Sequence, residues 1–181
     1  AKVTNGGKLT SLSFLEVGRR GTAGTLLVDG ASTVTAATSI TAGGGTDRPG
    51  SNGAITVQGG SILRSLGAHA AGNAGIALGS GTGDTGAITA TGAGSLLDAG
   101  GDRISVGSLG TGTLTISAGA KATAGNTLYA TPAAEAGFSL GSLGGTGTAT
   151  VTGAGSTLTV NGSLTDGGTS KIGDGMRGTT G

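Results

Sequence analysis

Apolar and polar residues alternate along this chain in short runs, and the runs recur in one order. Each copy begins with a glycine, continues with an apolar residue at every second position, turns at a Gly-Ala type sequence and ends in a second short run. A period of two residues is typical of β-strands and not of amphipathic helices. This two-strand sequence motif, which we call the phrase, occurs five times, at residues 24–34, 53–63, 86–97, 112–122 and 147–158.

A hydrophobic-X-hydrophobic-glycine box follows the phrases and predicts a third strand in each unit. The full boxes lie at residues 40–43, 76–79, 104–107 and 138–141, with a weaker box at 170–173 and an extra copy at 15–18. The opening glycines of the five phrases are 29, 33, 26 and 35 residues apart. A period in this range is typical of stacked-repeat proteins, in which each unit covers the hydrophobic face of its neighbour.

Aligning the copies predicts which side chains face the interior. The expected inward residues of the first strand are Leu26, Val28, Ile55, Val57, Ile88, Ala90, Leu114, Ile116, Ala149 and Val151. Those of the second strand are Val34, Leu63, Leu97, Ala122 and Leu158, and the boxes supply those of the third. Between the inward residues of the first strand stand threonines, whose β-branched side chains suit an exposed strand face: Thr25, Thr56, Thr89, Thr115 and Thr150.

Three strands per unit, all running the same way in successive units, predict an all-β fold, a single-stranded parallel β-helix of about six irregular coils. With coils about 4.8 Å apart, six copies give a rod core of about 25 to 30 Å. Glycine takes 43 of the 181 positions, which fits corners with positive φ and a narrow interior. Disorder is the alternative for a glycine-rich chain, but a disordered linker has no reason to repeat apolar residues in register.

The repeat predicts one β-solenoid segment over residues 1–181. It divides into a partial coil at 1–20 and repeats at approximately 21–51, 52–84, 85–110, 111–145 and 146–181. Residues 1–4 match 120–123, and residues 178–181 match 21–24. We therefore expect a window from a longer array, which continues along the chain or through end-to-end stacking of further copies.

Charge and composition exclude several partners. The net charge is +1, from ten basic and nine acidic residues that are scattered along the chain. Arg19, Arg20 and Arg48 are expected in solvated turns, and no basic stripe of the kind that tracks phosphates is present, so we expect no nucleic-acid partner. The chain has no cysteine and no run of eighteen apolar residues, so we expect neither a disulfide nor a membrane span in this segment.

The phrases at 147–158 and 112–120, together with the box sequence at 104–110, resemble the repeat associated with autotransporter (type V secretion) passengers and with PEP-CTERM surface proteins of bacteria. The resemblance covers nearly all of residues 1–181. It implies a β-helical passenger that is exported through a carboxy-terminal outer-membrane barrel. It also implies a location at the bacterial cell surface or outside the cell.

No residue is predicted to be catalytic, to bind a cofactor or to hold a metal. His69, the single histidine, has no carboxylate, serine constellation or cysteine near it in sequence and is expected to be a loop residue. Residues 81–86 match GxGxxG, but that motif binds nucleotides only between a strand and a helix, and no helix is expected to follow.

Calcium binding and polysaccharide cleavage are the two chemistries that need closer comparison. The stretches 79–84 and 43–47 resemble glycine-aspartate turns of calcium-binding rolls, but they do not recur every nine residues. A polysaccharide lyase or hydrolase needs two acids at a defined separation. Asp98 and Asp102, with Arg103, come nearest to that arrangement, and solvation of a strand end explains them equally well.

Two non-enzymatic functions remain. The first, and the one predicted here, is a structural or adhesive extracellular rod whose recognition of a host surface or glycan lies in the loops 42–52, 64–75 and 125–137. The second is an ice-binding face, suggested by Thr-X-Thr pairs at 113 and 115, 148 and 150, 150 and 152, and 157 and 159. Unit lengths that vary from 26 to 35 residues argue against a regular lattice-matching face.

Overall fold

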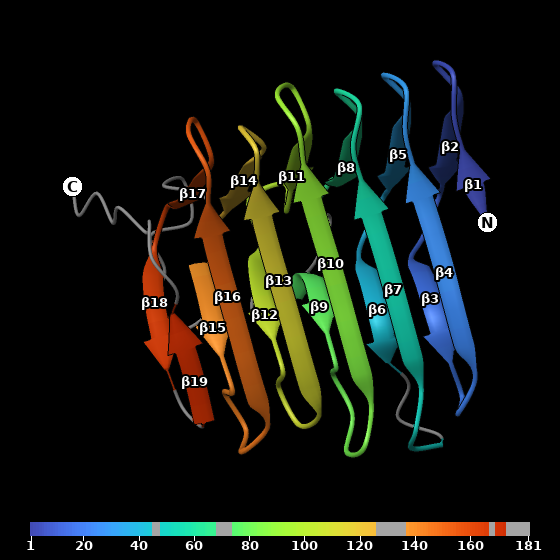
Figure 1. Cartoon of the computed structure of the whole chain (residues 1–181). Coiled ribbons are helices and arrows are strands. Elements are labelled where there is room, and N and C mark those ends of the chain that lie inside the picture. The colour runs from blue at the N-terminus through green and yellow to red at the C-terminus, as the bar shows by residue number, and fades with distance from the viewer. Residues whose placement is uncertain (45–47, 68–73, 126–136, 167–168, 173–181) are drawn as a thin grey trace.

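The computed structural model describes residues 1–44, 48–67, 74–125, 137–166 and 169–172. All helical or strand elements of these residues are β-strands, and they form three parallel sheets (Figure 1). We call these sheets A, B and C. The chain passes from sheet A to sheet B to sheet C and then returns to sheet A beside its previous strand. The expected parallel β-helix with three strands per coil is confirmed.

Each sheet collects one strand from every coil. Sheet A has seven strands: β1 (Lys2–Val3), β4 (Ala23–Val28), β7 (Asn52–Val57), β10 (Thr85–Thr91), β13 (Thr111–Ser117), β16 (Thr146–Thr152) and β19 (Thr169–Ile172). Sheet B has six strands: β2 (Lys8–Ser11), β5 (Thr33–Ala36), β8 (Ile62–Ser65), β11 (Leu96–Asp98), β14 (Lys121–Ala124) and β17 (Thr157–Val160). Sheet C also has six strands: β3 (Leu15–Arg19), β6 (Ile40–Gly44), β9 (Ala74–Leu78), β12 (Arg103–Val106), β15 (Gly137–Leu140) and β18 (Ser163–Asp166).

The core is a set of apolar columns that run along the axis of the stack. All inward residues predicted for the first and second strands are buried. One column of sheet A, for example, places Leu26, Ile55, Ile88, Leu114 and Ala149 opposite one another in successive coils. No coil encloses a core of its own, so the hydrophobic stabilisation comes from contacts between neighbouring coils.

Two short segments near the ends of the chain join a different sheet from the one expected. The weak box at 170–173 was expected to be a third strand, but β19 lies in sheet A beside β16, with Ala149 opposite Ile172. The third strand of that coil is β18, where Leu164 lies opposite Phe138. Only residues 161–162 separate β17 from β18. The chain therefore reaches sheet C earlier than the spacing of the boxes suggested.

At the other end, residues 1–4 were aligned with the second-strand sequence 120–123. In the structure β1 belongs to sheet A, where Lys2 lies opposite Leu27 and Val3 opposite Val28. The second strand of that coil is β2, in which Leu9 lies opposite Val34. Short alternating strands look alike in sequence, so pairing with the next coil decides which sheet such a strand joins.

The long loops expected at 42–52, 64–75 and 125–137 include strand residues at their ends. Residues 42–44 belong to β6, residues 64–65 to β8 and residues 74–75 to β9. The central residues 45–47, 68–73 and 126–136 lie outside the described part of the chain. Among the described residues no helix is long and apolar enough to span a membrane.

Candidate functional site

Three aspartates lie where strands meet corners, and each ties its own turn to a neighbouring coil. Asp29 Oδ1 accepts a hydrogen bond from the backbone N–H of Gly30 at 2.7 Å, and its Oδ2 accepts one from Gln58 Nε2 at 3.1 Å. The same arrangement recurs at Asp84 and Asp98 with different partners. These carboxylates therefore contribute to the stacking of the coils.

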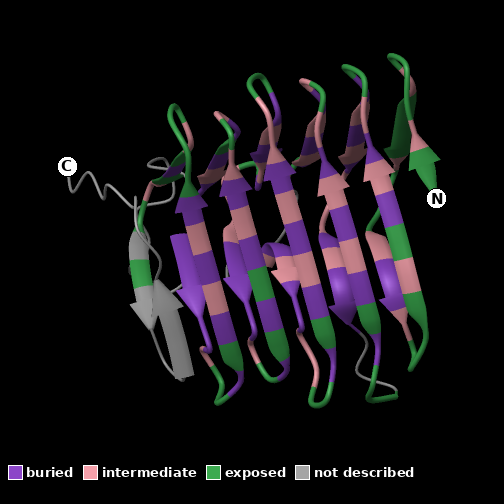
Figure 2. Ribbon diagram, in the orientation of Figure 1, coloured by how far each residue is buried: buried purple, intermediate pink, exposed green. Residues whose placement is uncertain are grey.

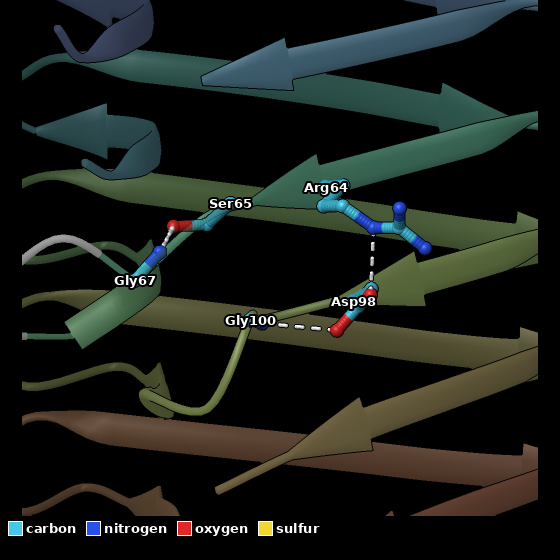
Figure 3. Close-up of polar contacts among 5 residues, drawn as sticks. All are labelled: Arg64, Ser65, Gly67, Asp98 and Gly100. Carbon is cyan, nitrogen blue, oxygen red and sulfur yellow. Dashed lines mark hydrogen bonds and ion pairs between the residues drawn. The ribbon is translucent and has the colours of Figure 1, made fainter. Parts of the chain in front are cut away.

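Asp98 is one of the two carboxylates that come nearest to an enzymatic acid pair in the sequence. Its Oδ2 accepts a hydrogen bond from Arg64 Nε at 2.8 Å, and its Oδ1 accepts one from the N–H of Gly100 at 2.9 Å. Figure 3 shows Arg64 and Asp98 pointing toward one another from β8 and β11. Arg64 lies opposite Asp98 in the pairing of these strands, so an ordinary ion pair between coils accounts for this carboxylate.

Asp102 and Arg103 flank the start of β12. Asp102 lies in the turn that follows Asp98, where its N–H donates to the carbonyl oxygen of Ala99 at 3.1 Å and its carbonyl accepts from the N–H of Gly125 at 2.8 Å. Arg103 is the first residue of β12. The backbone of Asp102 thus joins two neighbouring corners of the stack.

The glycine-rich turn at 81–86 holds the most buried carboxylate of the described residues. Asp84 is 1% exposed, and its Oδ1 accepts from the N–H of Ser51 at 2.9 Å while its Oδ2 accepts from the N–H of Gly81 at 3.2 Å. The turn leads into β10 and not into a helix, as the sequence predicted. Both carboxylate oxygens of the calcium-like stretch 79–84 already accept backbone hydrogen bonds.

The remaining candidates are quickly placed. His69 and Asp47 lie outside the described residues. Within the described part of the chain, no three His, Cys, Asp or Glu side chains are grouped so that they could hold a metal ion. Arg19, expected in a turn, is the last residue of β3 and forms an ion pair with Glu16 at 2.8 Å.

A column of serines that the sequence reasoning missed lines the corner before sheet B. The N–H of Ser32 donates to Ser61 Oγ at 3.1 Å, and the N–H of Gly60 donates to Ser95 Oγ at 3.2 Å. Farther along the stack, the N–H of Gly119 donates to Ser156 Oγ at 2.9 Å. Each serine thus satisfies a backbone donor of the preceding coil. The serine that opens each second strand is visible in the sequence, but its partner is not.

The outward face of sheet A carries a regular array of side chains. The pairing of β10, β13 and β16 places their outward positions in four columns, without any shift of register. The twelve positions hold ten threonines, one alanine and one serine: Thr85, Ala87, Thr89, Thr91, Thr111, Thr113, Thr115, Ser117, Thr146, Thr148, Thr150 and Thr152. We call this set the threonine face.

The sequence alignment placed Thr25 in one column with Thr56, Thr89, Thr115 and Thr150. The last four do lie opposite one another in successive coils. Thr25 instead lies opposite Ala54, and the equivalent of Thr56 in β4 is Leu27. The pattern of β4 differs from that of the later strands, and only the strand pairing reveals which residue continues the column.

The strands of sheet A stay in register although the lengths of the repeats differ. Their starting residues, Ala23, Asn52, Thr85, Thr111 and Thr146, all lie opposite one another in successive pairs. The variation from 26 to 35 residues is therefore taken up between the strands of sheet A and does not disturb them. Irregular repeat length is thus no argument against a regular outward face.

Figure 2 shows the strands of sheet A with buried positions alternating with intermediate and exposed ones. Comparisons with known proteins add nothing to this description: no protein-family model matches the chain, and neither a curated protein nor a solved structure matches it significantly.

Proposed function

We propose that this chain is part of a non-enzymatic extracellular rod, structural or adhesive, in a bacterial surface or secreted passenger protein. One observation carries the proposal. The apolar columns and the polar contacts at the corners both link each coil to the next one. The resemblance of the repeat to autotransporter and PEP-CTERM surface proteins supports the extracellular setting.

The partners proposed for such a rod are of two kinds. Adjacent repeats or further copies of the chain extend the stack, since each coil presents the same columns to the next. A host surface or glycan would contact the loops. Strands β8 and β14 both belong to sheet B and are each followed by a strand of sheet C, two coils apart.

Neither Asp98 nor Asp84 gives support to a polysaccharide-cleaving enzyme. Asp98 pairs with Arg64 and Asp84 binds two backbone donors. An acid that protonates or attacks a sugar needs an open position beside the substrate and a second acid at a defined separation.

The test combines a search for cleavage with a search for binding. We expect the purified chain to release no reducing ends from pectate, xylan or bacterial exopolysaccharides. We also expect a variant with residues 68–73 and 126–136 replaced by glycine-serine sequence of equal length to lose binding to cell surfaces, while its circular dichroism spectrum stays that of the parent chain.

Two results would contradict the proposal. Release of sugar that disappears in Asp98→Asn would show an enzyme. Binding to cells that is unchanged in the loop variant would remove the loops as the adhesive part. Electron microscopy of native material then distinguishes one long passenger from stacked copies.

A further inference from the structure

We propose that the threonine face of sheet A binds ice, an activity that goes beyond a structural or adhesive rod. The face has a regular geometry. Adjacent strands of a sheet lie about 4.8 Å apart, and alternate residues along one strand lie about 6.7 Å apart. The unshifted pairing of β10, β13 and β16 repeats these two spacings across all twelve positions. Both spacings are close to the distances at which oxygen atoms repeat on faces of hexagonal ice.

The side chains of this face are rigid. A threonine in a strand has a restricted χ1 angle because two heavy atoms are attached to its Cβ. Thr89, Thr115 and Thr150 lie opposite one another in consecutive coils, so the same restricted side chain recurs at the same backbone position. The face thus presents methyl and hydroxyl groups to water at regular intervals.

The hydroxyl groups of this face are available to water. Within the described residues, the hydrogen bonds among these side chains are limited to one, from Ser117 Oγ to Thr91 Oγ1 at 3.0 Å. The side chains at the strand starts, Thr85, Thr111 and Thr146, are exposed, as is Thr152 at the far end of β16. By contrast, the corresponding outward serines of sheet C, Ser105 and Ser139, are each 3% exposed.

The twelve positions of this face carry neither charged nor aromatic groups. The neighbouring strand β7 continues it with Asn52, Ala54, Thr56 and, just beyond the strand, Gln58. From β7 to β16 no outward position carries a charge, and beyond β16 Lys171 of β19 lies opposite Thr148. Ions and charged polymers are attracted mainly by charge, so the twelve positions themselves do not favour them. Flat sugar polymers are bound chiefly by stacking on aromatic rings, and none stands at these positions. Ice, an uncharged and periodic surface, fits the face best.

Figure 1 shows that the strands of sheet A lie side by side with little change of direction from one strand to the next. Open sheets usually twist by 20 to 25° per strand on average. The stacked coils thus hold the threonine face flatter than an isolated sheet, as binding to a crystal plane requires.

The experiment measures thermal hysteresis and the partition of the whole chain into slowly grown ice. We expect the parent chain to separate melting from freezing and to enter the ice fraction. Thr115→Lys places a charged, longer side chain at the centre of the face and should abolish both effects. Thr123→Lys makes the same substitution in the same coil but on sheet B, in the column of Asp98, and should retain both effects.

Stability is followed by circular dichroism for each variant. If Thr115→Lys does not fold, Thr115→Val replaces it, since valine keeps the β-branched shape and removes the hydroxyl; we expect a partial loss of hysteresis. Three outcomes overturn the proposal: no hysteresis and no partition of the folded parent chain, equal losses in the sheet A and sheet B variants, or binding to crystalline cellulose or chitin in place of ice.

Discussion

At the scale of single residues, two glycine columns hold sheets A and C close together. The glycine that opens each phrase needs no unusual backbone angle, but it has no room for a side chain. At Gly86, for example, an added Cβ would lie 2.0 Å from the carbonyl oxygen of Ala42 and 2.3 Å from the nitrogen of Gly79. The glycines that end the boxes at 15–18, 40–43, 76–79 and 104–107 have both constraints: at Gly43, φ is 62°, and a Cβ would lie 1.9 Å from the carbonyl oxygen of Thr85. The repeat thus begins and ends its strands with glycine because the two backbones touch.

Gly86→Ala should therefore destabilise the chain strongly. Overpacking usually costs 1–3 kcal/mol and sometimes more, and we expect about 3 kcal/mol or more here because the Cβ would collide with backbone atoms, which cannot rotate away. The shift of the urea unfolding midpoint measures this loss.

Gly144→Ala is the control for this substitution. Gly144 has a φ of 90° and nothing within 4 Å of an added Cβ. This substitution should therefore cost only the strain of alanine in a left-handed backbone conformation, about 1–2 kcal/mol. Equal losses in the two variants would show that close approach does not explain the opening glycines.

At the scale of strands and turns, each corner repeats one hydrogen-bonding arrangement with small changes. The serine column before sheet B is interrupted at Ala120, which occupies the place of Ser61, Ser95 and Ser156 in its coil. Ala120 is fully buried. By analogy with Gly60 and Gly119, the backbone N–H of Gly94 would face a hydroxyl at this position. This coil lacks one contact that the neighbouring coils make.

Ala120→Ser should restore that contact and stabilise the chain. A net hydrogen bond contributes about 0.5–1.5 kcal/mol, and the urea midpoint should rise accordingly.

The matched control for this change is Ala122→Ser in the same coil. Ala122 faces the apolar core and is 1% exposed, so its new hydroxyl would be buried among apolar side chains at a cost of about 1–3 kcal/mol. If both serines destabilised the chain equally, the serine column would have no stabilising role.

At the scale of the whole molecule, stability is distributed along the axis of the stack. The strands β10 and β13 pair with strands on both sides, and the apolar columns pass through them without a break. In such a structure each coil is coupled mainly to its nearest neighbours. A defect should therefore loosen its surroundings more than distant coils.

Ile88→Ala tests this coupling. Ile88 is fully buried and lies between Ile55 and Leu114, so the cavity should cost about 2–5 kcal/mol. Hydrogen exchange followed by mass spectrometry should accelerate most in β7, β10 and β13 and least in β1 and β19, the strands of sheet A farthest from β10. A uniform acceleration in all strands would contradict nearest-neighbour coupling and indicate a single cooperative unit.

The sequence by itself determined the fold class, the three strands per coil and the inward columns. Alternation along a strand is a local property: it places Leu26 and Val28 inside wherever that strand lies in the stack. Repetition of the same alternation then shows that successive strands share a role, which is why the inward residues predicted for the first and second strands are buried.

The tertiary structure alone decided how the coils are matched to one another. Pairing depends on hydrogen bonds between residues about thirty positions apart, and short alternating strands resemble one another too closely to reveal it. This is why the box at 170–173 belongs to sheet A, why Asp98 pairs with Arg64, and why repeats of unequal length still hold ten threonines in regular columns. The inserted residues fall between the strands of sheet A, where they leave its hydrogen bonds undisturbed.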